Sequence, residues 1–261
     1  MPLKTSEAFV IDVRRMREAD RLVVLFTEDE GKVSGVAASA AKSHRRFGGK
    51  LERLSRVRVT WFEKEGRDLA RLDACELLDG SFCLYQNLRS AMLLGYVAEV
   101  VDTFVRDREP ERRYYRLVRS VMDALRAGAD AALLARYFEV WTLRLHGLMP
   151  ELDRCGSCGR PLDDGAFLDV DDQGDARCTG CRTTGRWGRG TLRLPAGALA
   201  VMQRWRRLSP QEEARGGMSP LAQPAVLDEI EAFTSAVLAA FVGQPFRSTR
   251  FLRETLREVS A

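Results

Sequence analysis

The chain has 261 residues, of which 45% are hydrophobic and 30% are charged, and its formal net charge at pH 7 is +4. This length predicts two or three domains, and the composition is ordinary for a soluble globular protein with enough apolar residues for a core. Charged residues interrupt the apolar stretches, which argues against a signal peptide and a membrane span and favours a cytoplasmic protein.

Residues 6 to 80 are predicted to form a small β domain. Its first strand is indicated by Phe9, Ile11 and Val13, which alternate with other residues. Further strands are predicted over 21–27, 32–37, 57–61 and 69–78. Five short strands, with the long connection between the third and the fourth, are typical of a Greek-key barrel of the OB type.

The long connection, residues 40 to 53, carries much of the positive charge. From Lys32 to Arg58 there are eight basic residues and one acidic residue, a net charge of +7, so the rest of the chain sums to −3. This patch favours a polyanionic partner, most simply nucleic acid, over a merely solvated loop. Phe47 in this connection either stacks on bases of a single strand or closes one end of the barrel.

From Phe82 onward the apolar residues recur with a helical period. Three helices are predicted before Gly147, and three more are predicted after residue 190. We therefore expect an α+β protein of three parts. These are an OB-fold barrel (1–80), an α-helical domain (81–150 and 191–261) and a cysteine-rich module (151–190) inserted into that helical domain.

Four of the six cysteines form two C-x2-C pairs with nineteen residues between them: Cys155, Cys158, Cys178 and Cys181. Two such pairs are typical of a structural Zn²⁺ site, because each pair turns two thiolates toward one ion and the four thiolates leave no open coordination position. Iron in a rubredoxin-like site is the alternative metal. Disulfides or a redox C-x-x-C fit less well, because nothing indicates secretion and the pairs occur together.

The sequence offers no set of catalytic residues. Its two histidines, His44 and His146, lie in the basic connection and at a predicted helix end. The phosphate-loop pattern G-x-x-x-x-G-K-[ST], the metalloprotease pattern H-E-x-x-H and the nucleophile pattern G-x-S-x-G do not occur. We therefore do not expect an enzyme.

The segment from Glu18 to Val59 resembles the N-terminal barrel of the RecO family of bacterial recombination mediators. That family has a T-x-x-x-G turn followed by a basic S-x-R-F-G-G-x-L segment. Here the turn runs from Thr27 to Gly31 and the basic segment from Ser43 to Leu51, with one additional residue after Ser43. The order of barrel, helices and four-cysteine ribbon matches as well, as does a late Pro-Phe-Arg-Ser element at residues 245–248.

The resemblance implies a non-enzymatic protein of DNA repair and homologous recombination in the RecF pathway, associated with the nucleoid. Such proteins bind single- and double-stranded DNA and anneal complementary strands. With the partner RecR they help RecA to load onto DNA coated by single-stranded-DNA-binding protein, whose acidic C-terminal tail docks on the helical domain. The alternative is an OB-fold and zinc-ribbon RNA-binding protein associated with the ribosome or with tRNA.

The residues expected to contact phosphate are Lys42, Arg45, Arg46, Lys50, Arg53 and Arg56, with Arg14, Arg15, Arg17 and Lys32 as a second group. An acidic tail needs an apolar pocket ringed by cations. The residues expected to form that pocket are Arg112, Arg113, Tyr115, Arg116, Arg119 and Met122.

Overall fold

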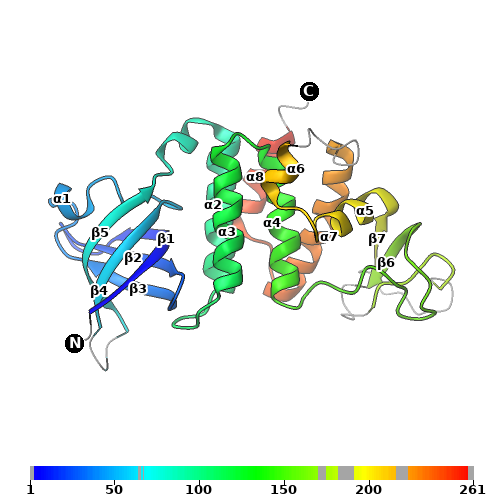
Figure 1. The fold of residues 1–261 in the computed structure, drawn as a ribbon, viewed down its shortest axis with the longest axis horizontal. Helices are drawn as coiled ribbons and strands as arrows, with labels where there is room; N and C mark the ends of the chain where they lie inside the picture. Colours follow the sequence, from blue (N-terminus) through cyan, green and yellow to red (C-terminus); the bar gives the residue numbers. More distant parts are fainter. Residues whose placement is uncertain are drawn as a thin grey trace. The chain divides into compact units, whose positions relative to one another are not determined.

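The computed structural model (Figure 1) describes residues 3–63, 66, 68–169, 175–181, 191–215 and 223–257, and only the backbone of His44, Arg45 and Asp169. The chain forms two compact units, Met1–Val118 with Phe246–Ala261, and Arg119–Pro245. Within the described ranges no helix is long and apolar enough to cross a membrane. The predicted α+β class is confirmed, with a strand-rich barrel first, then helices and a cluster of four cysteines.

The first unit begins with a closed barrel of five strands in the order β1-β2-β3-β5-β4. The strands are β1 (Leu3–Arg15), β2 (Arg21–Thr27), β3 (Gly31–Ala37), β4 (Arg56–Phe62) and β5 (Ala70–Asp79). β3 and β5 pair in parallel, whereas the other neighbours pair antiparallel. The last four strands lie within one residue of their predicted bounds, and the closed order matches the OB-type barrel.

A β-bulge in β1 decides which of its side chains fill the barrel. The register shifts between Val10 and Asp12, so Val10 packs into the barrel core before the bulge and Val13 packs against that core after it. The alternation of Phe9, Ile11 and Val13 that predicted this strand therefore does not continue through the bulge. Phe9 is fully buried outside this core, with its ring centroid 5.1 Å from that of Tyr115.

The connection between β3 and β4 contains the short helix α1 (His44–Phe47) and packs into the barrel. Phe47 is 2% exposed and belongs to the barrel core, with Leu51 packed against the same cluster. Of the two predicted roles for Phe47, closing the barrel is the observed one. Its ring is not available to stack on bases.

The first unit also contains the short 3-10 helix η1 (Phe82–Gln86), α2 (Leu88–Phe104), the first part of α3 (Arg112–Arg126) and α8 (Arg247–Arg257). The Glu99 carboxylate of α2 accepts hydrogen bonds from the backbone N–H groups of Arg247 and Ser248, both at 2.9 Å. Phe246 packs edge-on against Tyr96. These contacts explain the late Pro-Phe-Arg-Ser element, because three of its residues fasten the start of α8 to α2.

The turn between β2 and β3 is fastened to the segment after α2 by backbone hydrogen bonds. Lys32 N–H donates to the Arg106 carbonyl and Arg108 N–H donates to the Lys32 carbonyl, both at 3.1 Å. Gly31 has a φ of +69°, and a Cβ at this position would overlap the backbone of Glu109. Two features therefore require glycine at the end of the T-x-x-x-G turn: its left-handed φ and the close approach of another backbone segment.

In its described residues, the second unit contains the rest of α3, four further helices and a two-stranded sheet. The elements are α4 (Ala131–Leu145), β6 (Gly165–Asp169), β7 (Thr191–Pro195), α5 (Ala196–Arg204), α6 (Pro210–Arg215) and α7 (Pro224–Val242). Asp130 caps α4 by accepting from two backbone N–H groups, and Gly147 after α4 has a left-handed φ of +71°. The periodicity predicted these helices except α6, which is only six residues long.

Replacement of Gly31 by alanine is expected to destabilise the first unit more than replacement of Gly49. Both glycines have a left-handed φ, but a Cβ at Gly49 meets nothing within 4 Å. Gly49→Ala should therefore lower the free energy of unfolding by about 1 to 2 kcal/mol through φ strain alone. Gly31→Ala adds a backbone overlap and should cost about 3 kcal/mol or more. Urea denaturation of the two variants checks this, and equal losses would contradict the close approach at Gly31.

Candidate nucleic-acid interface and metal centre

Most of the predicted phosphate-binding residues lie on two segments that touch, the β1–β2 hairpin and the connection after β3. Ala41 N–H donates to the Ala19 carbonyl at 3.0 Å, and Ser39 N–H donates to the Asp20 carboxylate at 2.8 Å. Residues 12–21 and 40–53 together hold nine Lys and Arg against four Asp and Glu, a net charge of +5. We call the described cations of these two segments the basic end of the barrel: Arg14, Arg15, Arg17, Arg21, Lys42, Arg46, Lys50 and Arg53.

The cations of the basic end differ in how far acidic groups compensate them. Arg15, Arg17 and Lys42 are exposed, and no ion pair within the described residues involves them. Arg14 and Arg53 share the single carboxylate of Asp12, at 2.5 and 2.9 Å. Burial works against ionisation of Asp12, but hydrogen bonds from the two guanidinium groups lower its pKa. This three-residue group keeps a net positive charge.

Hydrogen bonds to backbone carbonyls hold two further cations of the basic end. Arg46 donates to the Ala38 carbonyl at 2.9 Å, and its guanidinium lies 5.2 Å from the centre of the Phe47 ring. Lys50 donates to the Cys75 carbonyl at 2.9 Å. Because a carbonyl is neutral, these bonds orient the side chains without cancelling their charge. The side chain of Arg45 lies outside the described residues.

Two predicted phosphate contacts, Lys32 and Arg56, form structural ion pairs instead. The Lys32 ammonium donates to the backbone carbonyl of Asp102 at 2.7 Å and pairs with its carboxylate at 3.3 Å. Arg56 lies between Glu7 and Asp79, and only 15% of its side chain is exposed. Acidic partners hold both cations, so we correct the prediction that they face DNA.

The predicted peptide pocket on α3 is also corrected. Tyr115 and Met122 are 0% and 1% exposed, and Tyr115 packs on Phe9 and Phe26, so neither side chain can line a surface pocket. Arg112 pairs with Asp29 at 2.8 Å. Arg113, Arg116 and Arg119 are exposed on the same helix. Because Tyr115 and Met122 are buried, these two side chains do not provide the apolar pocket that the arginines were expected to surround.

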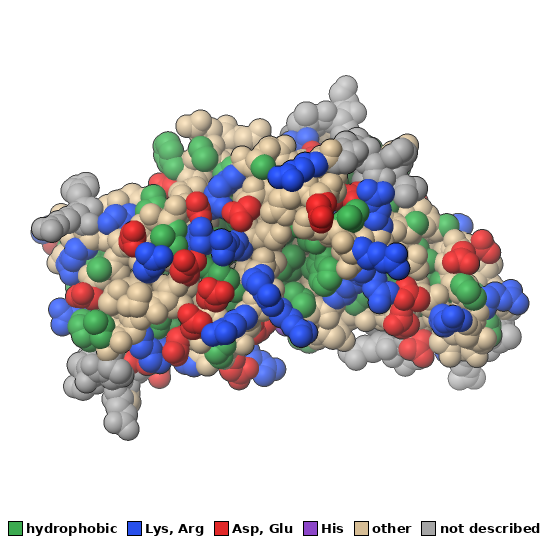
Figure 2. Space-filling view, viewed as in Figure 1, with side chains coloured by type: hydrophobic (Ala, Val, Ile, Leu, Met, Phe, Trp, Pro, Cys, Tyr) green, Lys and Arg blue, Asp and Glu red, His purple; other side chains and the backbone are tan. Residues whose placement is uncertain are grey.

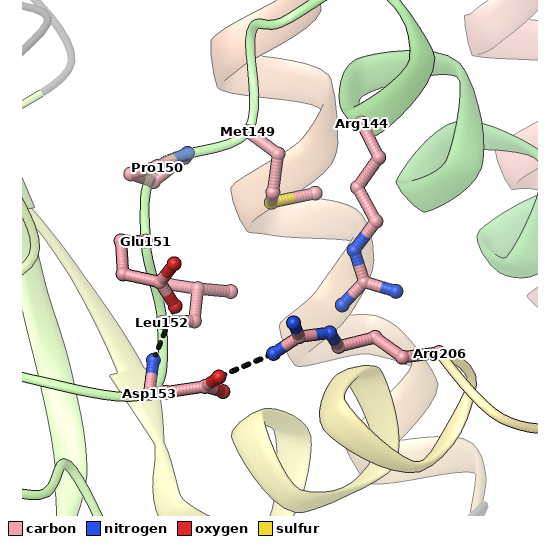
Figure 3. A pocket seen from close by; sticks show the side chains of 7 residues that line it. All are labelled: Arg144, Met149, Pro150, Glu151, Leu152, Asp153 and Arg206. Carbon is pink, nitrogen blue, oxygen red and sulfur yellow. Dashed lines mark hydrogen bonds and ion pairs between the residues drawn. The ribbon is translucent and has the colours of Figure 1, made fainter.

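A different pocket of about 200 Å³ lies within the second unit (Figure 3). Its apolar lining is Met149, Pro150 and Leu152, and its charged lining is Arg144, Arg206, Glu151 and Asp153. Arg144 comes from α4 and Arg206 from the turn after α5, and both guanidinium groups lie in the pocket, with that of Arg206 directed at Asp153 (Figure 3). Sequence reasoning missed this pocket, because its residues are brought together only by the packing of α4 and α5.

The two arginines of this pocket are not equivalent. Arg206 forms an ion pair with Asp153. Arg144 donates to the Met202 carbonyl at 2.6 Å, and its Nη1 is buried without a hydrogen-bond partner among the described residues. Burial, with the nearby charge of Arg206, lowers the pKa of Arg144 to about 10. A buried donor without a protein partner calls for an acceptor, which a water molecule or a ligand can supply.

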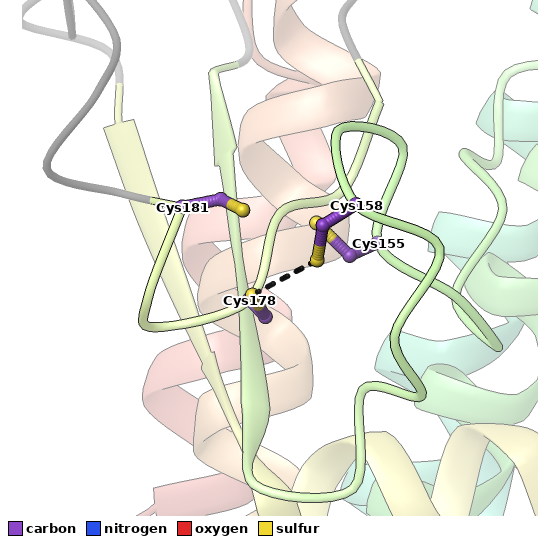
Figure 4. A group of neighbouring side chains, drawn as sticks. All are labelled: Cys155, Cys158, Cys178 and Cys181. Atoms are coloured by element: carbon purple, nitrogen blue, oxygen red, sulfur yellow. Dashed lines mark hydrogen bonds between the residues drawn. The ribbon is translucent and has the colours of Figure 1, made fainter.

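The four cysteines of the two C-x2-C pairs converge in the second unit (Figure 4). Their sulfur atoms all lie within 4.8 Å of one another, and the sulfurs of Cys158 and Cys178 are 3.8 Å apart. A tetrahedron with zinc–sulfur bonds of about 2.3 Å places its sulfurs about 3.8 Å apart. The donor set and spacing therefore fit a closed four-thiolate metal site.

The backbone around the cysteines is shaped for this convergence. Gly156 N–H donates to the Ala176 carbonyl at 2.9 Å, which joins the two pairs, and a Cβ at Gly156 would overlap the side chain of Asp175. Burial opposes ionisation of Cys155, but hydrogen bonds from backbone N–H groups lower its pKa to about 6. Hydrogen bonding with the neighbouring cysteines raises the pKa of Cys181 to about 12. Four thiolates at this spacing repel one another, so a cation is needed to hold all four ionised.

The remaining cysteines, Cys75 and Cys83, are free thiols. Burial raises the pKa of Cys75 to about 11, as expected for a small side chain in the barrel core, whereas Cys83 is exposed. Among the described residues, the group that could hold a metal ion therefore consists of the four cysteines that the spacing predicted.

Comparison with known proteins agrees with this architecture along nearly the whole chain. The family described as Recombination protein O N terminal matches residues 1–81, and the family described as Recombination protein O C terminal matches residues 85–250. A DNA repair protein RecO of Koribacter versatilis (strain Ellin345) is 47% identical over 166 residues, which cover 64% of this chain and 68% of that protein.

Two other relatives with the same printed name align over more of the chain. The protein of Anaeromyxobacter sp. (strain K) is 38% identical over 237 residues, 91% of each chain. That of Geobacter metallireducens is 33% identical over 250 residues, which cover 95% of this chain and 96% of the relative. These matches do not favour the alternative of a ribosome- or tRNA-associated protein. The chain belongs to the RecO family of DNA repair proteins.

Proposed function

We propose that this protein is a non-enzymatic recombination mediator that binds single- and double-stranded DNA at the basic end of its barrel and anneals complementary strands. With RecR it assists the loading of RecA onto DNA coated by single-stranded-DNA-binding protein, in the cytoplasm at the nucleoid. The observation that carries the proposal is the net charge of +5 on two touching segments of the barrel. Membership of the RecO family supports it.

The positive charge of the basic end explains how the protein would promote annealing. Two complementary strands repel each other through their phosphates, and a surface that contacts both lowers this repulsion. Arg15, Arg17 and Lys42 contribute most, because they are exposed and have no acidic partner in the described part of the chain that a phosphate must displace. Arg46, Lys50 and Arg53 supply further positive charge at positions fixed by hydrogen bonds.

The three predicted parts of the chain have separate roles in this proposal. Residues 1–80 bind DNA, the helical residues 81–150 and 191–261 contact partner proteins, and residues 151–190 form a structural zinc module. Zinc is favoured over magnesium or calcium because all four donors are thiolates. Zinc bound by four thiolates has no position for water or substrate, so it stabilises the module and takes no part in chemistry.

The acidic C-terminal tail of single-stranded-DNA-binding protein docks, in this proposal, in the pocket beside Arg144 and Arg206. Its apolar lining of Met149, Pro150 and Leu152 suits apolar side chains of the tail. The buried Nη1 of Arg144 offers an unused donor to a carboxylate. This pocket replaces the one predicted on α3.

The loss of two exposed cations from the basic end should reduce both the affinity for single-stranded DNA and its dependence on salt. For Arg17→Gln with Lys42→Gln, we expect the plot of log binding constant against log salt concentration to become less steep. The magnitude of its slope should decrease by about 1.4, which is about 0.7 for each lost phosphate contact. Fluorescence anisotropy with a labelled oligonucleotide at several salt concentrations measures this slope.

The matched control is Arg106→Gln with Arg250→Gln, since these side chains are 77% and 82% exposed and lie outside the barrel. This pair removes the same charge and should leave the slope near that of the wild type. Equal slopes for all three proteins would show that DNA binds elsewhere.

The wild-type protein should contain about one zinc ion per chain, and Cys155→Ser with Cys178→Ser should contain none. Binding of structural zinc contributes about 10 to 16 kcal/mol in small zinc domains. We therefore expect the module to become sensitive to protease, while binding of DNA changes less than about threefold. Elemental analysis and limited proteolysis measure the two effects. The control is Cys83→Ser, an exposed thiol outside the cluster; a double-serine variant that retains zinc would refute the site.

A charge reversal at Arg206 should weaken the binding of an acidic tail peptide by about tenfold or more, because it places a carboxylate in the pocket. The control is Arg207→Glu, which makes the same change at the next residue, also exposed but not lining the pocket. Titration of a labelled peptide against the two variants compares them. If both variants weaken binding alike, general electrostatic attraction accounts for it and the pocket does not.

A further inference from the structure

A row of exposed apolar side chains follows the barrel in the first unit. Phe82 and Tyr85 in η1 are 66% and 39% exposed, and Leu88 at the start of α2 is 61% exposed. In a 3-10 helix, residues three apart lie above one another, so Phe82 and Tyr85 share one side. Figure 2 shows hydrophobic side chains at the surface where the chain passes from β5 into α2.

The backbone beneath this row is fixed to the barrel. Ser81 is fully buried, its hydroxyl donates to the Arg53 carbonyl at 2.8 Å, and its N–H donates to the Ser55 hydroxyl at 3.2 Å. Leu84 is 8% exposed, and its N–H donates to the Ser81 carbonyl. Ser81 and Leu84 thus face inward and leave Phe82 and Tyr85 facing solvent. Rings on a fixed backbone lose little entropy when a ligand binds.

The row adjoins the basic end of the barrel. The Tyr85 hydroxyl donates to the carbonyl of Arg53 at 3.3 Å, so the ring lies beside the last cation of the connection. The Arg53 side chain is 46% exposed and shares its acidic partner, Asp12, with Arg14. Aromatic rings therefore continue a surface on which positive charge exceeds negative charge.

The size and charge of this surface favour nucleic acid over a protein as its ligand. A stable protein interface takes about 20 to 30 residues from each side, whereas the large apolar side chains that this row exposes are Phe82, Tyr85 and Leu88. Exposed aromatic rings beside cations match the requirements of a single strand, whose bases stack on the rings while its phosphates contact the cations.

We propose that Phe82 and Tyr85 form a stacking platform for unpaired bases of single-stranded DNA whose phosphates bind the basic end, an inference that rests on the proposed function. The platform takes over the role that Phe47 cannot fill from inside the barrel. It acts only on unpaired bases, because the faces of paired bases are covered by their neighbours in the duplex. The platform therefore gives the barrel a preference for single strands that positive charge alone does not provide.

Phe82→Ala tests the platform, because this exposed side chain contributes little to folding. We expect its affinity for a dye-labelled oligothymidine to fall about tenfold, while the salt slope and the affinity for a duplex of equal length stay unchanged. Phe82→Tyr should restore binding, since tyrosine keeps the ring. Phe251→Ala is the matched control, because Phe251 is 61% exposed on α8, and it should bind like the wild type.

The outcomes separate the platform from the proposed function. Wild-type binding to oligothymidine that Phe82→Ala leaves unchanged would overturn the platform and leave the DNA-binding function standing. Equal losses for single strand and duplex would also overturn it, because stacking on unpaired bases cannot act on a duplex. A variant that keeps DNA binding but no longer binds RecR would assign the row to a protein partner instead. A wild type that binds neither form of DNA would refute the proposed function itself.

Discussion

The packing of Phe47 into the barrel core is the contact on which the basic end of the barrel depends. The connection between β3 and β4 must close the barrel and carry cations at the same time, and a buried ring in the middle of the connection allows both. On either side of the ring, Arg46 and Lys50 donate to backbone carbonyls, which orients their charges. A connection without this anchor would hold the same charges but in no fixed arrangement, so phosphate binding would cost more entropy.

The basic residues of the barrel divide into those that hold it together and those that remain for a ligand. Lys32 and Arg56 are largely buried with acidic partners, and removing one partner of such a pair leaves an uncompensated charge. Arg15, Arg17 and Lys42 have no such partner within the described residues. The ion pairs thus fix the barrel and its contact with α2, while the exposed cations remain for the proposed binding of DNA. A count of basic residues along the chain does not distinguish these two groups.

Local patterns predicted much of this structure, because periodicity and spacing are set by the residues of one element. The strands β2 to β5, the longer helices and the four cysteines follow from such patterns. What failed depends on contacts between distant residues. Phe9 packs on Tyr115, which is far away along the chain, so a residue expected to form a pocket is buried in the core. The pocket beside Arg144 and the row from Phe82 to Leu88 appear only when separate elements pack.

The central claim is that the cationic end of the barrel brings two DNA strands together. The most direct test is the rate at which two complementary, dye-labelled oligonucleotides anneal with the wild-type protein over a series of salt concentrations. The account predicts clear acceleration at low salt that declines steeply as salt rises, because counterion release drives the binding. Annealing that the protein does not accelerate, or an acceleration that does not change with salt, would contradict it.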